Sequence, residues 1–410
     1  QVIQIRNDMI KRISDILIKT IMEHYLTSPD YNGINASLLK DPELSDIEIR
    51  QEIAALISDG LVGVLSYSFD TNPYINRFGF PDIEHQLAEL QNAFMSCVLY
   101  PTSKLLASEI DNECTTPMEH HLRLGHPQLK VMFFEYDVLL IYALDPRFYF
   151  EFNDYSGHIS SSDEVDKRRY INLKTFGIGR DGDRLVIAAF PRYLRNMSPA
   201  NQMLWESHRI QDASHCKVLK NYLDNEIHGS WSFPNTVYHS ILKEIENVNA
   251  LSESIFGVRF FRKVFKKNEL PDFDMLPFPS RHLYNDFLLL LEKITVSNIN
   301  ETFFDDLIDN VMLDNGKRKG SLNCLEEWLE QVSPKGKDLI CNPLKKVRKE
   351  RQSPAHKIQS NSYMPELLDE QHKMCISVYD SLNSLRILLS SHPLANEVNL
   401  PHKSTQYLEV

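Results

Sequence analysis

The segment Lys345–Lys357 combines the two residue types that cleavage of RNA without a metal requires. It holds six lysines and arginines against one glutamate, a local charge of +5, in a chain whose net charge is −12. Arg351 and His356 stand five positions apart within it. The planar guanidinium of arginine binds phosphate oxygens in pairs and stays charged at any physiological pH. The imidazole of histidine exchanges a proton near neutral pH.

These two groups suffice for an acid–base mechanism that needs no cofactor. The 2′-hydroxyl of RNA attacks the neighbouring phosphate, the histidine moves the proton, and the arginine stabilises the dianionic transition state. The products are a 2′,3′-cyclic phosphate and a 5′-hydroxyl. The sequence thus predicts Arg351 and His356 as a catalytic pair, without a metal. The residues predicted to hold the substrate are Lys345, Arg348, Lys349, Gln352 and Lys357.

A structural role accounts for the same charges and stays open as an alternative. On a helix, Lys345, Arg348 and Gln352 share one face because they follow one another at steps of three and four residues. Solvated lysines at the rim of a helical bundle, or an arginine paired with a carboxylate, would produce much of this pattern. Charge alone therefore does not distinguish an active site from a solvated face.

The composition is that of a multidomain globular protein. The chain has 410 residues, of which 42% are hydrophobic and 24% charged, so two or three domains are expected. Apolar runs such as Phe287–Leu291 are far shorter than the about 20 residues that a membrane span requires. The six cysteines lack the paired spacing of zinc sites and disulfide scaffolds. We expect a cytoplasmic protein with reduced thiols and no membrane partner.

Residues 1–80 have the pattern of a winged helix-turn-helix module. The expected elements are helices at 3–26, 36–40 and 45–59 and strands at 61–69 and 74–78. Ser45 and Glu48 have the spacing of a capping box at the start of the third helix. Gly60 is well placed to end that helix in the left-handed conformation.

The candidate recognition helix of this module is acidic. It carries Asp46, Glu48, Glu52 and Asp59 against Arg50 alone. A helix that reads DNA presents cationic or amide side chains to phosphates and base edges, so this face would repel a duplex. We expect the module to bind a protein partner or to dimerise, and a winged-helix DNA-binding regulator is the less favoured alternative.

Residues 81–278 are predicted to form a mixed α/β middle domain. The expected elements are helices at 82–98 and 129–144, strands at 148–152, 170–176 and 185–190, and a helix that begins at Ser198-Pro199. Gly177-x-Gly179 lacks the full Gly-x-Gly-x-x-Gly spacing of a nucleotide-binding loop, so a hairpin is the simpler interpretation. The histidines at 120, 121 and 126 lack the His-Glu-x-x-His pattern of a zinc site and are interpreted as structural.

Residues 279–398 are predicted to form an all-α helical bundle. The expected helices lie at 282–299, 302–313 and 321–332, from about 339 through the basic run, and at 366–389. The last of these repeats mostly apolar residues at helical steps from Leu367 to Leu389. Residues 399–410 are predicted to be a flexible tail. The predicted fold class is therefore α+β and multidomain.

The bundle and its Arg351-Gln352-Ser353-Pro354-Ala355-His356 motif resemble the HEPN superfamily. Ribonucleases of that superfamily carry Arg-x(4–6)-His, commonly with a polar residue after the arginine, a position that Gln352 fits. The resemblance covers about residues 280–392, and it implies a homodimer in which Arg351 and His356 of both chains build one site. Pro354 departs from a continuous helix, because it lacks an N–H and clashes with the carbonyl of Glu350. We expect a helix break near Gln352.

The sequence leaves two classes of function open. The resemblance implies a metal-independent HEPN-type ribonuclease or RNA-binding effector, and by analogy a role in phage defence or a toxin system. The alternative is a non-enzymatic regulatory protein that docks an anionic partner through the basic segment. Binding that weakens with salt and yields no product would favour the second class.

Overall fold

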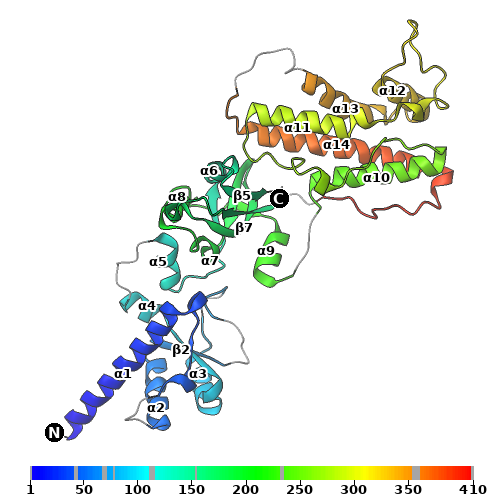
Figure 1. The fold of residues 1–410 in the computed structure, drawn as a ribbon. Helices are drawn as coiled ribbons and strands as arrows, with labels where there is room; N and C mark the ends of the chain where they lie inside the picture. Colours follow the sequence, from blue (N-terminus) through cyan, green and yellow to red (C-terminus); the bar gives the residue numbers. More distant parts are fainter. Residues whose placement is uncertain are drawn as a thin grey trace. The chain divides into compact units, whose positions relative to one another are not determined.

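The computed structural model describes residues 2–40, 45–66, 72–76, 79–109, 116–152, 155–230, 235–352 and 361–407, with side chains from Arg12 onward. The chain forms two compact units. The first comprises residues 1–138, 147–149 and 158–216, and the second comprises residues 139–146, 150–157 and 217–410. Neither predicted boundary, after residue 80 or after residue 278, coincides with this division. The mixture of helices and antiparallel sheets confirms the predicted α+β class (Figure 1).

A long helix and a small antiparallel sheet form the amino-terminal part of the first unit. Its elements are α1 (Val2–Thr27), β1 (Ile34–Asn35), α2 (Asp46–Ser58), β2 (Val62–Ser66), α3 (Ile83–Asn92) and β3 (Cys97–Pro101), with 3-10 turns at Pro29–Tyr31, Ala36–Leu38 and Phe94–Ser96. The strand order is β1-β3-β2. Leu17 and Ile21 of α1, Ile53 of α2, and Val64 and Leu99 of the sheet share one core.

The ends of α2 are formed by the residues that the sequence indicated. Ser45 Oγ accepts from the N–H of Glu48 at 3.4 Å, and the Glu48 carboxylate accepts from the N–H of Ser45 at 2.9 Å, which confirms the capping box. Gly60 has a φ of +68°, a conformation that L side chains rarely adopt, so glycine is suited to this position. Both ends of the helix are thus determined locally.

The predicted hairpin partner of β2 is wrong. β2 pairs with β3 in a register that sets Val64 opposite Leu99, and residues 74–76, the described part of the predicted partner strand, do not form a strand. Tyr74 instead lies in a turn, where its N–H donates to Asn72 Oδ1 at 2.9 Å and its ring is buried. The predicted helix at 82–98 is correspondingly shorter. It ends at Asn92, because Cys97 begins the strand that completes the sheet.

A second antiparallel sheet follows along the chain. Its strands are β4 (Met132–Glu135), β5 (Phe148–Phe152), β6 (Ser156–Ser161), β7 (Asn172–Asp181), β8 (Arg184–Ala189) and β9 (Cys216–Val218), in the order β4-β8-β7-β6-β5, with β9 on β7. The helices around them are α4 (Ser103–Glu109), α5 (Pro117–Arg123), α6 (Leu140–Ala143), α7 (Pro191–Leu194), α8 (Pro199–Ser207) and α9 (Lys220–His228), with 3-10 turns at Tyr136–Leu139 and Lys167–Arg169.

The sequence predicted this region unevenly. β5, β7 and β8 lie where strands were predicted, and Gly177 and Gly179 belong to β7 of the hairpin, opposite Ala188 and Val186. The predicted helix at 129–144 is wrong over Met132–Glu135, which forms β4 beside β8. The apolar run at residues 131–134 fits a buried strand as well as a turn of buried helix, so periodicity did not distinguish the two.

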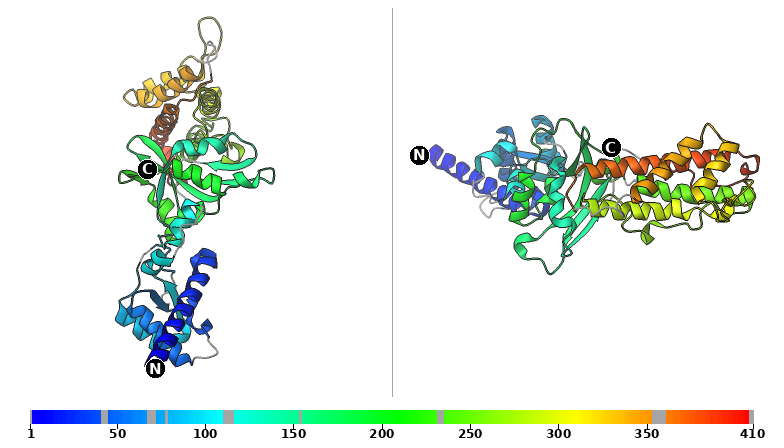
Figure 2. Two further views of the ribbon diagram at one scale, coloured as in Figure 1. Left: turned by 90° about the vertical axis from the view of Figure 1, so that its left-hand side faces the viewer. Right: turned by 90° about the horizontal axis from the view of Figure 1, so that it is seen from above.

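The second unit contains the long carboxy-terminal helices. They are α10 (Val237–Phe256), α11 (Arg281–Ile294), α12 (Ser321–Val332), α13 (Lys337–Gln352) and α14 (Glu366–Ser390), with 3-10 turns at Lys267–Glu269, Val296–Asn298, Glu301–Phe304 and Pro393–Ala395. In both figures α10, α11, α13 and α14 lie side by side (Figures 1 and 2). The bundle therefore begins at α10, which the sequence had assigned to the middle domain. The predicted helix at 302–313 is reduced to its first 3-10 turn.

The predicted flexible tail is wrong for the residues up to 407. His402 and Asn247 of α10 share two hydrogen bonds of 3.0 Å: Asn247 Nδ2 donates to the His402 carbonyl, and the His402 N–H donates to Asn247 Oδ1. Thr405 is buried, and its hydroxyl donates to Glu244 of α10 at 2.5 Å. These contacts hold the segment 401–407 on the bundle, because polar groups of α10 bond to it.

Candidate nucleic-acid interface on helix α13

One face of α13 is buried and the other carries the basic run. The buried face consists of Ile340, Cys341, Leu344 and Val347. Ser381 of α14 donates a hydrogen bond of 2.7 Å to the carbonyl of Ile340, which fixes the two helices against each other. Because these apolar positions recur at three- and four-residue steps, the intervening cations point away from the core.

Two of the cations are already paired within the protein. Lys345 Nζ lies 2.6 Å from Glu326 Oε2 of α12, and this hydrogen bond lowers the pKa of the Glu326 carboxyl. Lys346 Nζ lies 3.9 Å from Glu350 Oε1 one turn further along α13. Lys345, which was predicted to hold substrate, therefore has an internal carboxylate partner.

The carboxyl end of α13 presents cations without such partners. Arg348, Lys349, Arg351 and Gln352 are exposed. Among the described residues, none of the three cations forms an ion pair. Cations in the last turn of a helix are stabilised by the helix dipole, which accounts in part for Lys349 and Arg351. Arg348 lies a full turn before the end, where that effect has faded.

The predicted catalytic pair is only half described. Arg351 lies on the exposed surface of α13. His356, Lys357 and the expected helix break at Pro354 lie outside the described residues. Convergence of Arg351 and His356 thus stays a prediction.

Groups from α11 border this end of α13, and sequence reasoning missed them. The hydroxyl of buried Tyr284 donates to Glu350 Oε2 at 3.3 Å, and the Arg281 guanidinium lies 5.7 Å from the Tyr284 ring centre. Burial, and then the Glu350 charge, raise the pKa of the Tyr284 hydroxyl. The N–H of Met364, just before α14, donates to the carbonyl of Pro279, just before α11, at 2.8 Å. The starts of α11 and α14 therefore lie together. Only tertiary pairing reveals this neighbourhood.

A group of histidines lies in the first unit, away from the basic run in sequence. The rings of His121 and His126 are 5.2 Å apart, and Arg209 Nη1 lies 3.3 Å from His121 Nε2. Burial first, and then His126 and Arg209, lower the pKa of His121 to about 4. In the described part of the chain, no group of three or more His, Cys, Asp or Glu is arranged to hold a metal ion.

Acid should destabilise the first unit through His121. The folded pKa is about 4 against an ordinary value of 6.5, so between these values the unfolded chain binds the proton more tightly. Full stability is therefore expected above about pH 6.5 and declines toward pH 4. We expect His121→Gln to reduce the fall in Tm between pH 7 and pH 5, whereas exposed His215→Gln should not. Equal falls in wild type and His121→Gln would contradict this.

None of the described helices is long and apolar enough to cross a membrane. Comparison with models of protein families, with curated proteins and with solved structures found no match for the chain.

Proposed function

We propose that this protein is an RNA-binding effector whose carboxy-terminal bundle holds RNA on the exposed end of α13. The observation that supports this is the group of exposed cations Arg348, Lys349 and Arg351, which have no carboxylate partner among the described residues. The proposal includes metal-independent HEPN-type cleavage by Arg351 and His356. It also includes, by analogy, a role in phage defence or a toxin system.

The charge distribution favours a local site over a nucleic-acid-binding surface in general. The chain has a net charge of −12, which repels a polyanion at a distance. Salt limits the reach of each fixed charge to about 8–10 Å. RNA that comes close to α13 therefore interacts mainly with the cations of that helix. Lys345 and Lys346 are partly neutralised by Glu326 and Glu350, so the attraction concentrates in the last turns of the helix.

Reversing two of these cations tests the binding surface. We expect Arg348→Glu with Lys349→Glu to weaken binding of single-stranded RNA by at least about tenfold. The slope of log K against log salt should also become shallower by about 1.4, since two contacts at about 0.7 each are lost. Fluorescence anisotropy with a labelled oligonucleotide at several salt concentrations measures both quantities.

The matched control is Lys337→Glu, at the other end of the same helix, where Lys337 pairs with Glu330 at 2.7 Å. It reverses a charge on α13 and should leave affinity within about twofold. Equal loss in both variants would show a general charge effect and contradict a site at the carboxyl end. Tight binding without cleavage would favour the non-enzymatic alternative.

We further propose that residues 1–101 form a winged-helix module enlarged between β2 and β3. The sheet order β1-β3-β2, with α1 before β1 and α2 before β2, supports this. Arg50, the one cation of acidic α2, lies 4.5 Å from the Phe94 ring centre and donates to the carbonyl of Gln91 at 3.4 Å. Because this cation is engaged inside the module, a protein partner suits α2 better than DNA does.

The resemblance to HEPN proteins also makes a homodimer part of the proposal. Light scattering at several protein concentrations should give twice the chain mass of 47.6 kDa. A monomer at all concentrations that still cleaves RNA would remove the dimer from the proposal.

A further inference from the structure

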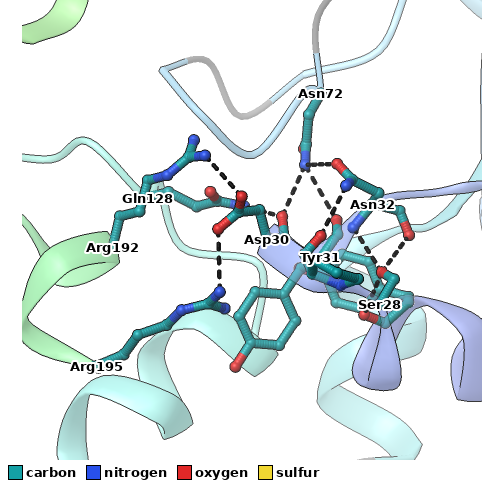
Figure 3. Close-up of polar contacts among 10 residues, drawn as sticks. Ser28, Asp30, Tyr31, Asn32, Asn72, Gln128, Arg192 and Arg195 are labelled. Atoms are coloured by element: carbon teal, nitrogen blue, oxygen red, sulfur yellow. Dashed lines mark hydrogen bonds and ion pairs between the residues drawn. The ribbon is translucent and has the colours of Figure 1, made fainter. Parts of the chain in front are cut away.

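Two arginines of the first unit converge on a single carboxylate (Figure 3). Arg192 of α7 places Nη2 2.7 Å from Asp30 Oδ2, and Arg195 at the end of α7 places Nη2 3.0 Å from Asp30 Oδ1. Arg195 also lies 5.0 Å from the ring centre of Tyr31. Each oxygen of Asp30 thus has its own guanidinium, the arrangement in which paired arginines also bind phosphate.

The backbone that delivers Asp30 is strained. Asp30 has a φ of +55° and Tyr31 a φ of +53°, which are the positive values found among the described residues other than glycine. Two successive side-chain-bearing residues in this region, one of them aromatic, are costly and persist only where neighbours enforce them. The turn is therefore held in place by its partners rather than by its own preference.

Amide side chains supply that enforcement. Asn72 Nδ2 donates to the carbonyl oxygens of Asp30 and Tyr31, both at 3.1 Å, and Gln128 Nε2 donates to the Asp30 carbonyl at 2.7 Å (Figure 3). The side chains of Arg192 and Arg195 keep 28% and 22% of their surface exposed, and Asp30 keeps 36%. A small anion in solution can therefore reach the pair without unfolding the unit.

We propose that Arg192 and Arg195 form a binding site for a phosphate group, and that Asp30 occupies this site in competition with the ligand. A phosphate carries more charge and more acceptor oxygens than a carboxylate, so it satisfies both guanidinium groups more fully. Once displaced, Asp30 and Tyr31 are free to leave the left-handed conformation. Gln128 Nε2 then becomes available as a further donor to the phosphate. This binding site goes beyond the RNA surface proposed on α13.

The test removes the negative charge of Asp30 while the fold of the turn is kept. Asp30→Asn removes the charge but keeps a side chain that tolerates positive φ. We expect Asp30→Asn to bind inorganic phosphate at least about tenfold more tightly than wild type, by titration calorimetry at constant ionic strength balanced with chloride. Adding Arg195→Gln to Asp30→Asn should remove the gain. Folded Asp30→Asn that binds phosphate no more tightly than wild type would overturn the proposal.

Glu253→Gln is the matched control, because it breaks a carboxylate–arginine pair of 2.8 Å with Arg259 in the other unit. It should leave phosphate affinity unchanged, and a comparable gain there would overturn the assignment to Arg192 and Arg195. A gain for acetate equal to that for phosphate would overturn the choice of phosphate. Titration with ATP shows whether the bound phosphate group belongs to a nucleotide or is the free ion. Tighter binding of ATP than of inorganic phosphate indicates a nucleotide, and equal binding indicates the free ion.

Hydrogen exchange in the wild-type protein gives a second readout that needs no variant. Saturating phosphate should accelerate exchange in a peptide covering residues 28–33, because the amide contacts of the turn are released. Unchanged or slower exchange in that peptide would overturn the displacement of Asp30.

Discussion

Replacing His356 with alanine should abolish RNA cleavage measured in EDTA, with the rate falling by about 10²–10⁴-fold. The residue supplies the proton transfer in the proposed mechanism, and no metal takes part that could replace it. RNA binding should survive, because the cations that hold the phosphates remain on α13. Arg351→Ala should lower cleavage by a comparable factor and weaken binding as well, since arginine both holds the phosphate and stabilises the transition state.

A second histidine near this end of the bundle provides the sharpest control. His282 is exposed at the start of α11, the element whose Tyr284 contacts Glu350 of α13. His282→Ala should leave cleavage unchanged. If cleavage persists in His356→Ala and disappears in His282→Ala, the catalytic role of His356 is wrong although the nuclease is real. Loss of 2′,3′-cyclic phosphate ends in both variants would mean that His282 also takes part in cleavage. That result would contradict a mechanism in which His356 alone transfers the proton.

Replacing Arg386 with methionine should lower the free energy of unfolding by about 3–5 kcal/mol. Arg386 Nε lies 3.1 Å and 2.9 Å from the two carboxylate oxygens of Glu244, whose side chain is 0% exposed. Methionine fills similar space but leaves the Glu244 charge buried with Thr405 as its remaining partner. Breaking a buried pair on one side is costly because the other charge loses its compensation.

An exposed pair in the same unit shows what a similar substitution costs at the surface. Arg259 Nε lies 2.8 Å from Glu253 Oε2, and the two side chains are 56% and 51% exposed. Arg259→Met should leave the free energy of unfolding nearly unchanged, because both charges stay solvated. Urea denaturation of the variants measures the difference. Similar values for Arg259→Met and Arg386→Met would mean that burial of Glu244 does not matter, and recovery of stability in a Glu244→Met, Arg386→Met double variant would confirm that it does.

The elements that the sequence predicted best carry their signals locally. α14 extends from Glu366 to Ser390 almost as predicted, because a long repeat of apolar residues has no competing interpretation. The Ser45 cap of α2 and the Ser198 cap of α8 are also as predicted. Such caps depend on a few adjacent residues, so sequence alone determines them.

The errors concern partners that are distant in sequence. β3 follows β2 only after α3, so its pairing with β2 depends on which strand buries its apolar face in the core. The segment 401–407 has few apolar residues and gave no sign of docking, because its binding uses the polar groups of Asn247 and Glu244. Neither partner choice leaves a local pattern.

In the candidate site, too, the sequence indicated what depends on neighbouring residues and missed what depends on partners from other helices. The sequence placed Arg348 and Gln352 on one helical face with Lys349 beside them, and these three side chains are exposed. It placed Arg351 on the face of Leu344 and Val347, yet Arg351 is exposed while those two residues are buried. It did not predict that Lys345 is paired, because Glu326 belongs to another helix. Arg281 and Tyr284 could not have been found either, since only the packing of α11 against α13 brings them near Glu350.

The docked segment 401–407 has a consequence for how the chain is made. The carboxylate of Glu244 finds its partners 142 residues later at Arg386 and 161 residues later at Thr405. A growing chain on the ribosome therefore exposes α10 with an uncompensated acid for as long as those residues remain to be synthesised. The bundle must close after translation has passed residue 405, and contacts of such long sequence separation form slowly. During this interval we expect the apolar face of α10 to be accessible to chaperones.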